Sequence, residues 1–165
     1  MSKIEWQFAD EPVSEDYVKS VGNHLGVVYP EDYTSCASIN HGANVDPALF
    51  DIGNREKVFG TLLSYDKDND EFIVDVYNSY KETLPKGLVP FAFDPAGNLI
   101  CFDYKDHEDH EDNPIVVYWE HENAGEKEMY MREEGLTEEQ AEKRARENVF
   151  YVAETFTEFL KKLHD

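Results

Sequence analysis

Apolar residues recur at helical spacing near the start of the chain. Residues 13–26 and residues 29–42 each carry such a run, with Val18, Val21 and Leu25 in the first and Tyr33, Cys36 and Ala37 in the second. Ser14 can cap the first run, Pro30 suits the first turn of the second, and Gly42 can end it. The pattern predicts two helices.

Shorter apolar runs later in the chain predict strands. They cover residues 43–52, 56–66 and 113–122, and two more within residues 88–104 flank a turn at residues 94–97. The turn reads Asp-Pro-Ala-Gly, which favours a hairpin. Tyr118 and Trp119 are neighbours in the last strand and therefore point to opposite faces, so we expect one of them in the core.

Residues 70–85 combine strand propensity with a helical period. Ile73, Val76 and Tyr77 begin an apolar stripe, Asp70 can cap it, and Pro85 can stop it. We predict a helix here, because the period extends over the whole segment.

Two helices are predicted at the end of the chain. Residues 136–147 are polar, open with a capping box of Thr137 and Gln140, and pair their basic cluster of Lys143, Arg144 and Arg146 with interleaved acids. Residues 149–164 carry a stripe of Val152, Phe156, Leu160 and Leu163. This order of elements predicts an α+β fold, a central, mostly antiparallel sheet with helices packed on it, as a single domain over residues 1–165.

Charge is the strongest compositional signal. The 165 residues include 36 Asp and Glu against 15 Lys and Arg, a net charge of −21. A field of this sign repels nucleic acid and anionic membranes and attracts basic proteins or cations, although solubility alone would also account for it. The first residues lack the layout of a signal peptide and no apolar run approaches a membrane span, so we expect a cytoplasmic protein.

The sequence offers little support for catalysis. Cys36 and Cys101 fall in apolar patterns typical of small buried hydrophobes, which disfavours a reactive thiolate. No nucleophile elbow, phosphate loop or dinucleotide fingerprint is present. We therefore expect no enzyme activity and no cofactor.

Residues 66–77 resemble the opening of a calcium loop. Asp66, Asp68 and Asp70 have the right spacing, but Glu71 and Tyr77 stand where the loop needs a glycine and a bidentate glutamate. We interpret the stretch as a solvated acidic turn.

Three histidines suggest a metal site at first sight. His107 and His110 lie in the acidic connector of residues 105–112, and His121 follows the next strand. Nothing apolar anchors the connector, so its ligand geometry would not be preset, and we expect no metal site. A metal-dependent enzyme built on these histidines stays open as the least favoured alternative.

The order of the motifs resembles the SUKH superfamily. Residues 25–42 are similar to its short helix, although His41 interrupts the family's Asn-Gly step, residues 88–104 to its central hairpin, and residues 152–163 to its closing helix. The positions that carry the resemblance are Leu25, Pro30, Tyr33, Gly42, Pro90, Phe91, Ala92, Gly97 and Asp103.

The resemblance implies a SUKH-like fold and a binding role. Bacterial members are mainly immunity proteins that bind and neutralise a toxin, often a nuclease, and the superfamily also includes a yeast regulator of cell-wall synthesis. We expect an antitoxin with a basic toxin as partner; the alternative is a general protein-interaction or regulatory module. The candidate partner-binding residues are Asp66, Asp68, Asp70, Tyr104, Asp106, Glu108, Asp109, Glu111 and Asp112. The toxin, the contact face and the oligomeric state are not encoded in any motif.

Overall fold

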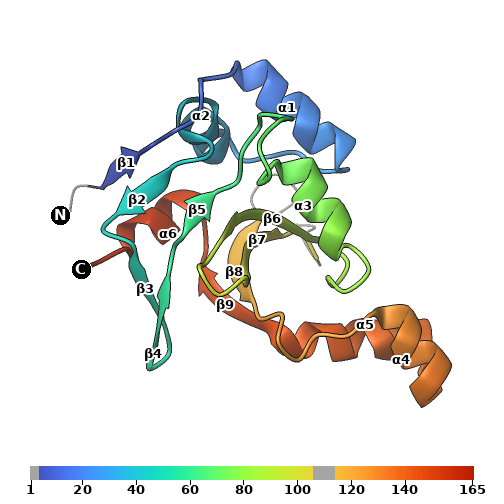
Figure 1. Ribbon diagram of the computed structural model, residues 1–165. Helices are drawn as coiled ribbons and strands as arrows, with labels where there is room; N and C mark the ends of the chain where they lie inside the picture. The colour runs from blue at the N-terminus through green and yellow to red at the C-terminus, as the bar shows by residue number, and fades with distance from the viewer. Residues whose placement is uncertain (1–3, 106–113) are drawn as a thin grey trace.

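A five-stranded antiparallel sheet forms the centre of the molecule. The computed structural model describes residues 4–105 and 114–165 (Figure 1). The strand order follows the chain: β5 (Thr61–Leu62), β6 (Leu88–Phe93), β7 (Leu99–Asp103), β8 (Ile115–Trp119) and β9 (Val149–Ala153). The predicted α+β class and the predicted hairpin, β6–β7, are confirmed.

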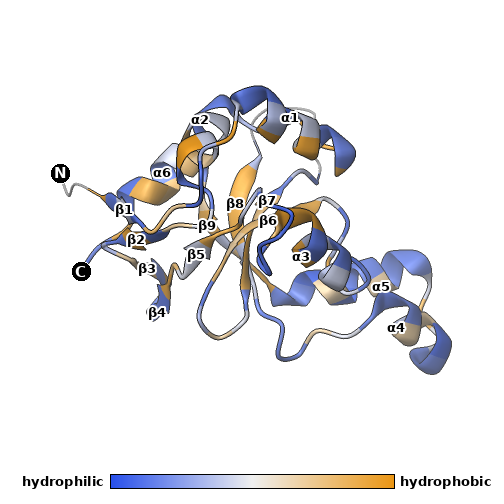
Figure 2. Cartoon of the chain, turned by 45° about the horizontal axis from the view of Figure 1, so that its top comes forward, coloured by the Kyte–Doolittle hydropathy of each residue, from blue (hydrophilic) through white to orange (hydrophobic). Residues whose placement is uncertain are grey.

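Three helices cover one face of the sheet. These are α1 (Glu15–His24), α2 (Glu31–Asn40) and α6 (Phe156–Lys161), whose apolar side chains join the larger core cluster. Ser14 caps α1, because its side chain accepts the N–H of Tyr17 at 3.1 Å, as predicted. Figure 2 shows the hydrophobic residues concentrated on the strands and on the inner sides of these helices.

The opposite face of the sheet is covered by α3 (Ile73–Tyr80) and the chain around it. Tyr80 of α3 meets Trp119 edge to face, with ring centroids 5.6 Å apart. Tyr118 and Trp119 point to opposite faces as predicted, and both of them, rather than one, are fully buried. The sheet is covered on both sides, which the alternation of the strand could not reveal.

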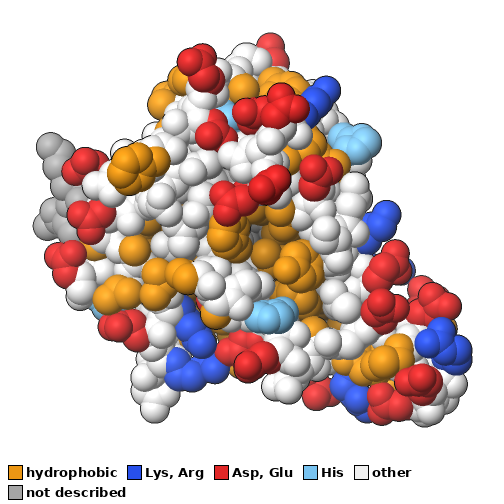
Figure 3. Space-filling model, viewed as in Figure 1, with side chains coloured by type: hydrophobic (Ala, Val, Ile, Leu, Met, Phe, Trp, Pro, Cys, Tyr) orange, Lys and Arg blue, Asp and Glu red, His pale blue; other side chains and the backbone are white. Residues whose placement is uncertain are grey.

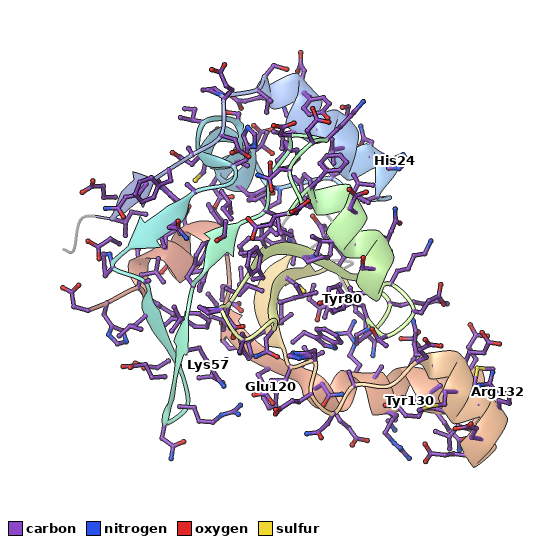
Figure 4. All side chains as sticks on the ribbon, viewed as in Figure 1. His24, Lys57, Tyr80, Glu120, Tyr130 and Arg132 are labelled. Carbon is purple, nitrogen blue, oxygen red and sulfur yellow. The ribbon has the colours of Figure 1, made fainter. Side chains whose placement is uncertain are left out.

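Two further helices form an arm beside the sheet. They are α4 (Lys127–Glu134) and α5 (Glu138–Ala145), and a short 3-10 turn, η1 (Arg146–Asn148), leads from α5 into β9 (Figure 1). The capping box of Thr137 and Gln140 on α5 is confirmed. The sequence pattern did not predict α4, whose one buried side chain is Tyr130 (Figure 4).

Two small ribbons flank the main sheet. β1 (Glu5–Gln7) pairs with β2 (Asn44–Asp46), and β3 (Leu49–Ile52) pairs with β4 (Arg55–Val58). The predicted strands 43–52 and 56–66 are therefore each divided in two. The first is interrupted at Pro47, which follows a cis peptide bond. The second is interrupted at Gly60, where a Cβ would lie only 2.6 Å from the backbone oxygen of Phe93.

Two predicted helices need correction. Residues 149–153 form β9 rather than a helix, and α6 begins only at Phe156, after Thr155. The β-branched and aromatic side chains of this segment favour a strand, and pairing with β8 satisfies its backbone. In the second case, α3 is confirmed as a helix, but its N-cap is Phe72 and not Asp70.

Candidate partner-binding surface

An open pocket of about 610 Å³ lies at the N-terminal end of α1. Its lining comes from the segment before α1, from α1 itself and from the loop after β5: Glu11, Pro12, Val13, Ser14, Tyr17, His41, Tyr65, Asp66, Lys67 and Asp68. We call this pocket the acidic groove, because Glu11, Asp66 and Asp68 are exposed at its rim and Lys67 is its one base. Figure 3 shows acidic side chains gathered over α1 and the segment that joins β5 to α3.

His41 forms the floor of the acidic groove and is almost fully buried. Its Nδ1 accepts the N–H of Tyr65 at 2.9 Å, so the ring proton lies on Nε2, which donates to Glu11 O at 2.7 Å. Both ring nitrogens are therefore used by a neutral imidazole. His41, which interrupts the family's Asn-Gly step, therefore joins three segments that are far apart in the sequence.

Asp10, next to Glu11 of the acidic groove, links the segment before α1 to the loop after β5. Its Oδ2 accepts hydrogen bonds from Ser64 Oγ at 2.6 Å and from Asn69 Nδ2 at 2.9 Å. Gly42, with φ of +81°, packs so closely that a Cβ would lie 2.6 Å from the same carboxylate. Sequence reasoning missed Asp10, Ser64 and Asn69, because no local pattern connects residues more than fifty positions apart.

The loop after β5 is organised by its own side chains. Asp66 Oδ1 accepts the N–H of Asp68 at 3.0 Å, and Asn69 Oδ1 accepts the N–H of Glu71 at 2.8 Å. Partial burial, with the nearby Asp10 and Asp70 carboxylates, raises the pKa of Glu71. The side chains of Asp66, Asp68 and Asp70 are exposed, as expected for a solvated acidic turn.

The other predicted patch begins at the opposite end of α1. Tyr104 is half-buried and its hydroxyl donates to Val28 O at 2.9 Å, beyond the C-terminal end of that helix. Since α1 has ten residues, about 15 Å of helix separates Tyr104 from the acidic groove. The remaining candidates, Asp106, Glu108, Asp109, Glu111 and Asp112, lie outside the described residues, as do His107 and His110.

The third histidine of the sequence-based metal hypothesis has a protein partner. His121 donates from Nδ1 to Asn98 Oδ1 at 2.7 Å, and its backbone N–H binds the same oxygen at 3.0 Å. Asn98 in turn binds Asp94 and the Tyr118 hydroxyl, which also donates to Asp94. These contacts fix the β6–β7 turn against the end of β8.

The two thiols are free and poorly suited to nucleophilic chemistry. Burial raises the pKa of Cys36 to about 11 and raises that of Cys101 well above its ordinary value. A thiol with so high a pKa carries almost no thiolate at neutral pH. Cys101 is buried as expected, whereas Cys36 is only partly buried.

An ion pair between the buried Asp103 and the partly buried Arg146 joins the hairpin to the arm. Arg146 Nη1 and Nη2 donate to the two Asp103 oxygens at 2.6 and 3.1 Å, and Nη2 also donates to Lys86 O. Arg144 pairs with Glu134 at 3.1 Å, which agrees with a self-paired basic cluster. Glu142, however, pairs with Lys127 at 2.7 Å and not with Arg146 as the four-residue spacing predicted.

The comparisons with known proteins identify the family. The model of the SMI1 / KNR4 family (SUKH-1) matches residues 12–162. The chain belongs to this family. A search of the curated proteins found no match. Among the helices of the described residues, none is long and apolar enough to cross a membrane.

The SUKH-1 motif positions are mostly internal. Tyr33 is fully buried, its hydroxyl lies 2.6 Å from that of Tyr65, and its ring meets those of Phe91 and Phe102. Ala92 is also buried, and the pairing register of β6 with β7 shifts between Pro90 and Ala92. Gly97 takes a φ of +89° in the hairpin turn. These residues therefore help to build the fold.

Proposed function

We propose that this SUKH-1 chain is a cytoplasmic immunity protein, a non-catalytic antitoxin. Residues 1–165 would act as one domain that binds a cognate basic toxin of the nuclease type and covers its active face. The observation that carries the proposal is the acidic groove in a protein of charge −21, on a family fold whose motif residues lie inside. A nuclease must bind phosphates, so its active face is expected to be basic.

The acidic groove is suited to a long basic side chain. Pro12, Val13 and Tyr17 give the wall apolar surface on which an aliphatic stem can lie. Glu11, Asp66 and Asp68 place carboxylates at the rim, within reach of an ammonium or guanidinium head. Because His41 and Asp10 are held by hydrogen bonds, the walls are fixed before a partner arrives.

The acidic connector supplies a second candidate contact. Tyr104, which directly precedes the connector, is anchored to Val28. The acids of the groove and of the connector would together attract a basic protein and speed the encounter with it. Asp70 and Tyr104 belong to this proposed surface as its flanks.

Co-purification with the product of the neighbouring gene tests the proposal. We expect a stable complex, and we expect the purified chain to inhibit that protein's nuclease activity at equimolar concentration. A heat-denatured sample of the same chain serves as the inactive control, because any anionic polymer would otherwise imitate the effect. The absence of a toxin-like neighbour, or undiminished nuclease activity in the complex, would contradict the antitoxin role and favour the interaction module.

A further inference from the structure

The end of the chain is fastened to the β3–β4 hairpin. The N–H of His164 donates to Leu49 O at 2.8 Å, and the N–H of Leu49 donates to His164 O at 3.1 Å (Figure 1). Residues directly opposite in an antiparallel pair place their side chains on the same face. The imidazole of His164 therefore lies on the face that carries Leu49 and, two residues further along β3, Asp51.

A second carboxylate lies on this same face. Asp51 is directly opposite Glu56 in the β3–β4 register, and both side chains are exposed. Like charges in such a cross-strand pair destabilise the hairpin. The neighbouring bases point to the other face, where Arg55 and Lys57 bind Glu120 at 2.7 and 3.6 Å (Figure 4).

His164 directs a ring nitrogen at these carboxylates. Its Nδ1 donates to the backbone oxygen of Asp165 at 3.0 Å, so when the ring is neutral its lone pair lies on Nε2. That atom is shielded from solvent, makes no hydrogen bond and lies 3.2 Å from Asp51 Oδ2. A backbone acceptor on Nδ1 is the arrangement that prepares Nε2 for a metal.

We propose that Asp51, Glu56 and His164 form a site for a divalent transition-metal ion of the zinc type. Their ligand atoms all lie within 4.8 Å of one another. Tetrahedral zinc, with bonds of about 2.0–2.1 Å, needs ligand separations of about 3.4 Å, and the exposed carboxylates can close this difference by rotating. One imidazole with two carboxylates fits zinc better than magnesium or calcium, which prefer oxygen ligands alone.

The metal would connect the end of the chain to the hairpin. It would neutralise the Asp51–Glu56 repulsion and add a cross-link between the residues after α6 and both strands of the ribbon. The site lies apart from the acidic groove and shares no residue with it. Its test is therefore independent of whether the chain is an antitoxin.

Zinc titration of the full, metal-depleted chain without a purification tag tests the site. We expect one equivalent to bind and the melting temperature to rise by several degrees in excess zinc. His164→Ala and Glu56→Gln should each weaken zinc binding by at least about tenfold while leaving the circular dichroism of the metal-free chain unchanged. Magnesium at the same concentration should leave the melting temperature unaltered.

Two control variants separate this site from other histidines. His24→Ala removes an exposed imidazole at the end of α1, and the double variant His107→Ala/His110→Ala removes the pair in the acidic connector. Both should bind zinc as the parent does. Equal binding after His164→Ala, loss of binding in the connector variant, or weak non-stoichiometric uptake by every variant, an adventitious ion only, would overturn the proposal.

Discussion

The aromatic core and the acidic groove are stabilised by different kinds of contact. In the core, Phe91 stacks on Phe102 with centroids 4.4 Å apart, and Tyr33, Phe156 and Phe159 meet the same ring. In the groove, polar contacts hold walls that expose carboxylates at the rim. The difference teaches that the buried motif residues build the fold, while the proposed recognition surface is built mainly by residues outside the motif.

The largest effect is expected from the core. Phe91→Ala should lower the free energy of unfolding by about 4 kcal/mol, because it removes a fully buried ring and leaves a cavity among four other aromatics. Phe8→Ala is the matched control, since that ring is 84% exposed and its loss should change stability by less than about 0.5 kcal/mol. Urea denaturation measures both. Similar losses in the two variants would contradict the assignment of stability to this core.

The variant Gly42→Ala tests the close packing of Gly42 against Asp10. Gly42→Ala should cost about 2 kcal/mol, because its φ of +81° is strained for alanine and the new Cβ would meet the Asp10 carboxylate. Gly26→Ala is the control: its φ is +87°, but nothing lies within 4 Å of its Cβ, so it carries the backbone cost alone. Equal stabilities of the two variants in urea would show that the contact with Asp10 is unimportant.

Local chemistry predicted much of this fold. Ser14, Thr137 and Gln140 cap the helices that their positions indicated, because a cap depends on residues three or four apart. Residues 149–153 were misassigned, because their apolar spacing fits a helix and a strand equally well over so short a span. Only the pairing with β8 decides between the two.

The groove could be predicted only in part. Its exposed acids, Asp66 and Asp68, were visible as a run of charge. The contacts that fix its walls join Asp10 to Ser64 and Asn69, and no periodicity connects positions so far apart. For the same reason, the ion pair of Asp103 and Arg146 could not be read from either motif alone.

Neutralising the exposed acids at the rim of the acidic groove should change stability least and recognition most. The variant Glu11→Gln/Asp66→Asn/Asp68→Asn removes three exposed negative charges from the acidic groove. The control Glu128→Gln/Glu133→Gln/Glu139→Gln removes three exposed charges from the α4–α5 arm. Both should unfold within about 0.5 kcal/mol of the parent, because surface substitutions of this kind have small effects.

The association rate of these variants with the basic partner tests the central claim most directly. In stopped-flow measurements at low salt, we predict that the groove variant associates about tenfold more slowly than the parent, that the arm variant changes by less than about twofold, and that added salt removes the difference. A variant neutralised at Asp106, Glu108, Asp109, Glu111 and Asp112 measures the share of the connector. Equal rates for the groove and arm variants would contradict the account, because the net charge and not the acidic groove would then govern recognition.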